Sequence, residues 1–77
     1  MDFKLRGKDY CLTKHEVENI MERKIPEQIK LYYIKVKGVE YPPKQVLAEV
    51  LGIGKIEFTT MDAGNILKRL GFKLERK

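Results

Sequence analysis

Cys11 and His15 are the only cysteine and the only histidine in the chain, so nucleophilic chemistry would have to begin with them. A cysteine–histidine pair needs both side chains within hydrogen-bonding distance and a third group that orients the base. His15 falls in the first turn of a predicted helix, where we expect it to be exposed. A metal site needs three or four suitable ligands, which these two residues and scattered carboxylates do not form. We therefore expect no catalytic residues, no metal and no cofactor.

The segment Gly-Ile-Gly-Lys at residues 52–55 superficially resembles a phosphate-binding loop. It lacks the Gly-x-x-x-x-Gly-Lys-Ser/Thr spacing of such loops, and it follows a predicted helix, whereas the loop should follow a strand. Nucleotide hydrolysis is therefore not expected, and the chain is predicted not to be an enzyme.

Basic residues outnumber acidic ones by 16 to 11, which gives a net charge of +5 and a pI near 9.4. The excess is uneven. Residues 28–56 carry five lysines and two glutamates, and residues 68–77 carry five basic residues and one glutamate, whereas residues 9–27 and 57–67 are net acidic. An uneven basic surface is typical of proteins that bind polyanions, nucleic acid above all. Lysines also favour exposed strand faces and protect strand edges, so a charged coat without a ligand is the alternative.

Tyrosines interleave with these lysines. If Tyr33 shares a strand face with Lys35 and Lys37, the hairpin offers an aromatic ring beside positive charges, which suits stacking on a base. A tyrosine-rich hairpin core is the alternative. Near the end of the last predicted helix, Lys68 and Arg69 suit phosphate contacts, although the helix dipole also favours cations there. The residues predicted to contact nucleic acid are Lys30, Tyr33, Lys35, Lys37, Lys44, Lys68, Arg69 and Lys73.

Several strands and helices must position these side chains, and the sequence of the first part of the chain predicts one strand and one helix. Residues 2–6 alternate polar and apolar types and predict a short strand that Gly7 ends. Thr13 and Glu16 form a capping-box pattern, so we predict a helix over residues 14–24 that stops before Pro26.

The middle of the chain predicts a hairpin and a helix. Residues 29–37 are rich in β-formers, with Tyr32, Ile34 and Val36 on the face expected to be buried. A tight turn at residues 37–38 returns the chain as a strand over residues 39–41. A helix over residues 43–51 follows, with proline at its start and Gly52 at its end.

The last part of the chain predicts a helix and a closing strand. Residues 56–58 are expected to be extended, with Phe58 buried. Apolar residues at positions 63, 66, 67 and 70 have the spacing of an amphipathic helix, and Gly71 and Phe72 suit a Schellman ending. The predicted order is (β)αββααβ. The fold class is therefore α+β, a single small domain over residues 1–77 with an antiparallel sheet and helices packed on one face.

Nine residues carry a resemblance to a known family. They are Gly38, Tyr41, Pro42, Lys44, Phe58, Leu67, Leu70, Gly71 and Phe72. In this pattern the chain resembles the small N-terminal head domain of modification-dependent HNH restriction endonucleases and related defence proteins, over about residues 13–74. The resemblance implies an accessory, DNA-associated module. It implies no nuclease chemistry, because the 77 residues contain no counterpart of the nuclease domain.

The predicted function is non-catalytic binding of nucleic acid, with double-stranded DNA favoured over RNA. The alternative is a protein-interaction adaptor or an accessory subunit of a defence or regulatory complex, with Ile29, Leu31 and Tyr33 as its apolar edge. One cysteine and the absence of an apolar leader predict a reduced, cytoplasmic protein. No apolar run approaches the ~18 residues of a membrane span, and we expect a monomer or a weak homodimer.

Overall fold

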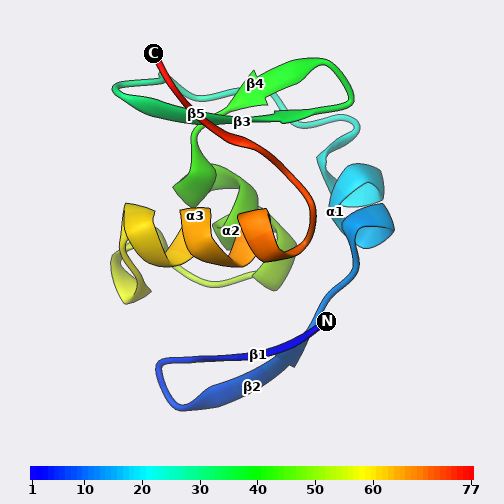
Figure 1. The fold of residues 1–77 in the computed structure, drawn as a ribbon, viewed down its shortest axis with the longest axis vertical. Coiled ribbons are helices and arrows are strands. Elements are labelled where there is room, and N and C mark those ends of the chain that lie inside the picture. Colours follow the sequence, from blue (N-terminus) through cyan, green and yellow to red (C-terminus); the bar gives the residue numbers. More distant parts are fainter.

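The helices form a layer between two antiparallel sheets, and the two termini lie at opposite ends of the molecule (Figure 1). A computed structural model describes residues 1–77. The elements are β1 (Asp2–Leu5), β2 (Lys8–Cys11), α1 (Lys14–Met21), β3 (Tyr32–Val36), β4 (Val39–Tyr41), α2 (Pro43–Leu51), the short 3-10 helix η1 (Lys55–Glu57), α3 (Thr60–Arg69) and β5 (Leu74–Arg76). The predicted α+β class is confirmed.

The larger sheet has the strand order β4–β3–β5, with both pairs antiparallel. Ile34 lies at its centre, opposite Tyr41 on one side and Leu74 on the other. Because strand residues alternate between faces, Ile34 and Val36 are buried against the helices as predicted. The predicted turn is also present: Lys37 and Gly38 both have positive φ, 49° and 82°, as a type I′ turn requires.

The smaller sheet is a hairpin of β1 and β2 that was not predicted from the sequence. Arg6 and Gly7, with φ of 54° and 79°, close it in the same way as the turn between β3 and β4. The prediction of a single sheet is therefore wrong, because a two-residue turn lets β1 pair with the segment that immediately follows it. The hairpin lies on the other side of the helix layer from the larger sheet (Figure 1) and buries Phe3 and Leu5 in the same core.

The first helix begins where the capping box predicts and ends earlier than predicted. The Thr13 hydroxyl accepts a hydrogen bond from the Glu16 backbone, and the Glu16 carboxylate accepts one from the Thr13 backbone. The helix ends at Met21, not at residue 24. Tyr41 helps to hold the chain in this path. Its buried hydroxyl lies 2.9 Å from the Met21 carbonyl oxygen at the end of the helix, which also accepts from the Lys24 N–H, and 3.1 Å from the Lys24 carbonyl oxygen.

The last helix is capped at both ends, and its end is the one predicted. Thr59 and Asp62 form a capping box at its start. At its end the Phe72 N–H donates to the Leu67 carbonyl and the Gly71 N–H to that of Lys68, both at 3.0 Å, which is the Schellman pattern.

Of residues 56–58, which were predicted to be extended, only Phe58 has an extended backbone. Residues 55–57 instead form η1, since the Glu57 N–H donates to the Gly54 carbonyl and the Glu57 carboxylate accepts from the Gly54 N–H. Phe58 is buried as predicted.

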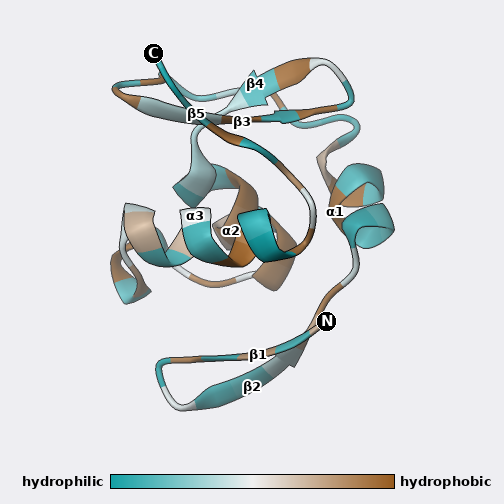
Figure 2. Ribbon diagram, in the orientation of Figure 1, coloured by the Kyte–Doolittle hydropathy of each residue, from teal (hydrophilic) through white to brown (hydrophobic).

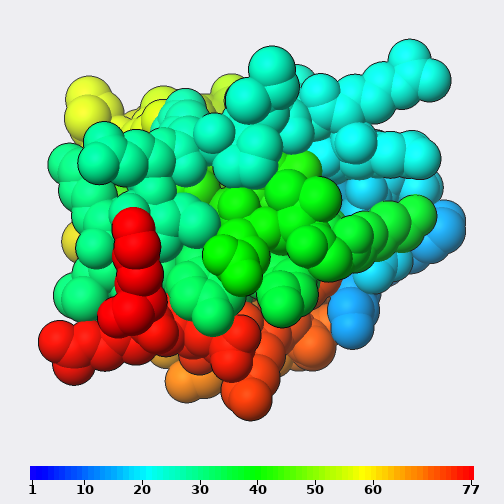
Figure 3. Space-filling model, turned by 90° about the horizontal axis from the view of Figure 1, so that it is seen from above, coloured from blue at the N-terminus to red at the C-terminus, as the bar shows by residue number.

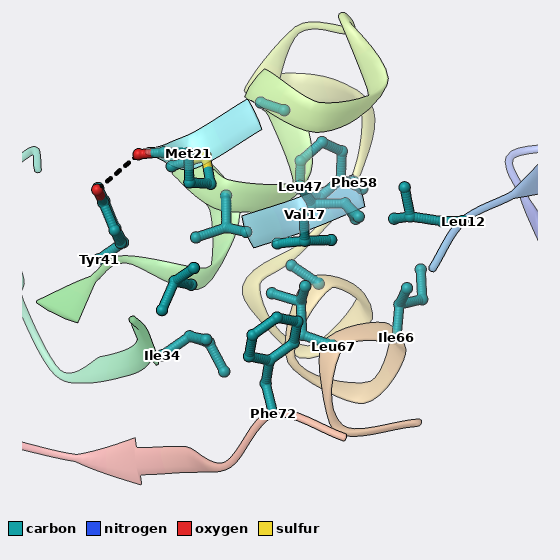
Figure 4. Close-up of a cluster of buried hydrophobic side chains, with 14 of the residues drawn as sticks. Leu12, Val17, Met21, Ile34, Tyr41, Leu47, Phe58, Ile66, Leu67 and Phe72 are labelled. Carbon is teal, nitrogen blue, oxygen red and sulfur yellow. Dashed lines mark hydrogen bonds between the residues drawn. The ribbon is translucent and has the colours of Figure 1, made fainter. Parts of the chain in front are cut away.

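The core lies between the sheets and is built around α2 and α3. Figure 4 shows side chains from α1, β3, α2 and α3 converging on the space between the helices, with the Tyr41 hydroxyl reaching the Met21 carbonyl at its edge. Five residues of α2 are buried, compared with two of α1, and in Figure 2 α2 is accordingly the most hydrophobic helix. Gly64 lets α3 approach β5 closely, because a Cβ at this position would lie 2.9 Å from a methyl carbon of Leu74.

Candidate nucleic-acid interface

Most cationic side chains have no acidic partner. Only four of the sixteen lysines and arginines make an ion pair, namely Lys4 with Asp9, Lys24 with Glu49, Lys55 with Glu27 and Lys73 with Glu75. Three further carboxylates, those of Glu16, Glu57 and Asp62, accept hydrogen bonds from backbone N–H groups at helix starts. These acidic residues serve local capping, which leaves the positive charge on side chains that are free to meet a ligand.

The outer face of the larger sheet carries both signs of charge. It holds Tyr33 and Lys35 of β3, which lie directly opposite Glu75 and Glu40. Partial burial and the neighbouring carboxylates, Glu75 above all, raise the pKa of the Tyr33 phenol. Lys73 pairs with Glu75 at 3.6 Å. Cross-strand pairing thus places glutamates beside residues that were predicted to contact nucleic acid. This outer face of the sheet, which Figure 3 shows from above, is therefore less basic than the spacing of its lysines suggested.

Two other groups of predicted residues lie apart from this face. Lys37 is exposed at the tip of the turn between β3 and β4. Lys68 and Arg69 are exposed in the last turn of α3, within the helix layer. Their position there also complements the helix dipole. The structure therefore distributes the predicted contacts over several surfaces.

The remaining predicted residues, Lys30 and Lys44, meet at a groove of about 570 Å³. Its lining comes from the segment before β3, the first turn of α2, η1 and the start of α3. The residues are Glu27, Gln28, Lys30, Leu31, Tyr32, Pro42, Pro43, Lys44, Gln45, Lys55, Thr60 and Met61. Figure 3 shows the teal segment that enters β3 beside the yellow segment of η1 and the start of α3 at one edge of the view.

Gln45 holds one wall of this groove in place. Its side chain is 3% exposed. The amide nitrogen donates to the Ile25 carbonyl, and the amide oxygen accepts from the Glu27 N–H, both at 2.8 Å. Because both bonds go to backbone groups of the connection between α1 and β3, the groove wall is fixed by α2.

Three lysines and one glutamate line the groove. Glu27 is the only acid, and its carboxylate pairs with Lys55. Lys30 and Lys44 make no ion pair, so two uncompensated cations face this space. Lys44, which was expected to be exposed as a phosphate contact, is half-buried, with the ammonium nitrogen 6.0 Å from the centre of the Phe58 ring. A cation over an aromatic face is stabilised there.

Tyr32 and Lys55 belong to the groove and were not predicted as contact residues. Tyr32 was assigned to the core because it shares the buried face of β3, but at the start of the strand that face extends beyond the core. Lys55 belongs to the Gly-x-Gly-Lys segment, whose spacing is wrong for a phosphate loop. The prediction that Ile29, Leu31 and Tyr33 lie on one face of a strand is also wrong, because β3 begins only at Tyr32.

The remaining chemistry-bearing residues form no second site. No three His, Cys, Asp or Glu side chains are grouped as metal ligands would be. Cys11 is exposed on β2, and a hydrogen bond from its thiol to Asp2 together with the charge of that carboxylate raises its pKa. None of the helices has the length and apolar character that crossing a bilayer requires.

No family model, curated protein or solved structure matches this chain. The function is therefore argued from the charges, the groove and the exposed side chains described above.

Proposed function

We propose that the protein is a non-catalytic nucleic-acid-binding domain with double-stranded DNA as its preferred ligand. The observation that carries this proposal is the set of unpaired cations, since twelve of the sixteen basic side chains make no ion pair while several acids are occupied at helix starts. Free lysines and arginines bind phosphates by releasing condensed counterions.

The resemblance noted in the sequence supports the same proposal through one residue. Tyr41, Phe58, Leu67 and Phe72 are buried, and Gly71 ends α3, so these members of the pattern serve the fold. Lys44 is the only charged member, and it lines the groove. A cation at the first turn of a helix opposes the helix dipole, and a residue that contradicts a local preference is a better candidate for function than one that agrees with it.

The test is a salt titration of binding to duplex DNA, single-stranded DNA and RNA of matched length. If the protein neutralises about four to six phosphates, log affinity falls with log salt concentration at a slope of about −4 to −5 on duplex DNA. Duplex DNA is expected to bind most tightly. A flat salt dependence, or no binding at about 50 mM salt, rules out the proposal.

A protein-interaction adaptor or accessory subunit is the second candidate, and exposed apolar residues favour it. Ile25, Ile56 and Met61 are 84%, 90% and 55% exposed. Scattered exposed apolar residues are common on monomers, which is why nucleic acid ranks first. Chemical cross-linking that captures a specific protein through these residues, with no binding of nucleic acid, would favour the second candidate.

A further inference from the structure

The groove lined by Lys30, Lys44, Lys55 and Tyr32 differs from the other basic surfaces because it combines free cations with an aromatic and apolar wall. We propose that it receives one unpaired nucleotide of the bound nucleic acid, with the phosphate between the lysines and the base against Tyr32. This proposal rests on the proposed function and names the part of the ligand that the groove recognises.

The cations are placed for a phosphate. Lys30 comes from the segment before β3, Lys44 from α2 and Lys55 from η1, so three distant parts of the chain each contribute a lysine to the lining of one groove. Glu27, the single acid, is already engaged by Lys55. Lys44 is half-buried, and a charge that has lost part of its hydration interacts more strongly with an anion than an exposed charge does.

The rest of the lining is placed for a base. Tyr32 is half-buried, and its backbone is held in the sheet opposite Arg76. Pro42, Pro43 and Met61 add apolar surface to the lining. A base has two flat faces that stack on aromatic rings, whichever of the four bases it is. The amide of Gln28 and the hydroxyl of Thr60 also line the groove and can bond to base edges.

The size and chemistry of the groove select an unpaired nucleotide. Its volume of about 570 Å³ lies within the ~300–1,000 Å³ range of small-molecule sites, and a duplex cannot enter it. Paired DNA presents phosphates on its outside and keeps the faces of its bases stacked inside. Only an unpaired nucleotide presents a phosphate and a base face together, which is what this lining complements.

The test compares a blunt DNA duplex with the same duplex carrying one unpaired 2-aminopurine nucleotide. We expect binding to be about tenfold tighter when the unpaired nucleotide is present, with quenching of its fluorescence by Tyr32, because base–aromatic stacking adds to the phosphate contacts. Equal affinity for the two duplexes overturns the groove proposal while the proposed function stands. Failure to bind either duplex overturns both.

Matched variants locate the effect. Lys30→Gln with Lys44→Gln is expected to abolish the preference for the unpaired nucleotide, whereas Lys68→Gln with Arg69→Gln removes the same charge elsewhere and should weaken both duplexes equally. If Lys44→Gln lowers the melting temperature, Lys30→Gln alone, at an exposed position, supplies the comparison. A preference that persists in the Lys30→Gln variants overturns the proposal. Binding of free deoxynucleoside monophosphate without binding of either duplex would also overturn it, together with the proposed function.

Discussion

At the scale of single residues, Tyr41 and Gln45 show how polar side chains shape the path of the backbone. Both are buried, and both bond to backbone groups between the end of α1 and the start of β3. Buried polar groups need partners because an unpaired one retains its full cost of desolvation. These two residues therefore hold a segment that has no regular structure of its own.

Tyr41→Phe is expected to lower the free energy of unfolding by about 1–2 kcal/mol, because it removes the hydroxyl that lies within hydrogen-bonding distance of the Met21 and Lys24 carbonyls in a buried position. Urea denaturation measures this decrease. Tyr10→Phe is the matched control, since its ring remains stacked on Phe3 at 5.6 Å and it should cost less than about 0.5 kcal/mol. Equal decreases in the two variants would show that the Tyr41 hydroxyl contributes nothing specific.

Cys11 supplies a prediction about reactivity. Its raised pKa, caused first by the hydrogen bond to Asp2 and then by that carboxylate's charge, reduces the thiolate fraction near neutral pH, and the thiolate is the form that reacts. Asp2→Ala should lower the pKa, speed alkylation at about pH 7.5 and move the midpoint of the pH–rate profile to lower pH. The control is Asp9→Ala. The Asp9 carboxylate lies on the same hairpin but pairs with Lys4, so its removal should leave the alkylation rate unchanged. If both variants react alike, Asp2 is not the cause.

At the scale of elements, the two hairpins share one kind of turn. In each, a basic residue and a glycine take positive φ, at Arg6–Gly7 and Lys37–Gly38. Positive φ is costly for a residue with a side chain, although asparagine tolerates it better than lysine does. Each turn fixes the register of its hairpin and thereby decides which residues face the core.

Lys37→Asn tests this cost. It should raise the free energy of unfolding by about 0.5–1 kcal/mol, since asparagine followed by glycine suits a type I′ turn. Thermal melting should then show an increase of a few degrees. Lys35→Asn makes the same chemical change within β3, where asparagine is disfavoured, and should lower the melting temperature. A decrease in both would mean that the charge of Lys37 matters more than the turn geometry.

The buried face of α3 supplies the second prediction at this scale. Leu67 is completely buried, and Leu67→Ala should cost about 2–5 kcal/mol by leaving a cavity. That is a large part of the ~4–12 kcal/mol expected for a chain of this length. Asn65→Ala, on the exposed face of the same helix, is expected to be neutral or slightly stabilising. A cost below about 1 kcal/mol for Leu67→Ala would contradict the tight packing of this face.

At the scale of the whole molecule, the distribution of charge decides which faces can meet a polyanion. The molecule measures 30 × 23 × 19 Å, so its basic groups lie within a few Debye lengths of one another at physiological salt. The outer sheet face carries acids beside its lysines, whereas the groove holds two free cations and one neutralised pair. We therefore expect the lysines to contribute unequally.

Changing Lys35, Lys37 and Lys44 together to glutamine should weaken binding to duplex DNA and reduce the salt slope by about one for each phosphate that is no longer neutralised. The single Lys37→Gln variant should account for more of the weakening than Lys35→Gln, because Lys37 is exposed at the turn whereas Lys35 lies opposite Glu40. The control changes Ile25 and Ile56, which lie outside the groove, to serine; it should leave the slope unaltered and matter only if the ligand is a protein. A triple lysine variant that binds like the parent at about 100 mM salt would exclude these residues from the DNA-binding surface.

Short-range patterns in the sequence determined much of the fold. The capping box at Thr13, the Schellman ending at Gly71, the turn at Lys37 and the apolar face of α3 were all predictable, because each depends on residues within one or two turns of chain. The basic character of the protein was likewise apparent from composition. The turn at Arg6–Gly7 has the same pattern as the turn at Lys37, a basic residue followed by glycine, but it was not recognised as a turn, and the sequence was therefore read as predicting a single sheet.

Only the tertiary structure decided where the charges meet. The path of the chain at the end of α1 is held in part by Tyr41, which lies twenty residues away, and the groove depends on Lys30, Lys44 and Lys55, which come from three separate segments. Cross-strand pairing placed Glu40 opposite Lys35 and Glu75 opposite Tyr33, and neither Lys35 nor Tyr33 has an acidic neighbour in its own strand. The physical reason is that backbone preferences act between neighbours in sequence. Electrostatic fields and buried hydrogen bonds act between neighbours in space, and packing is what determines those neighbours.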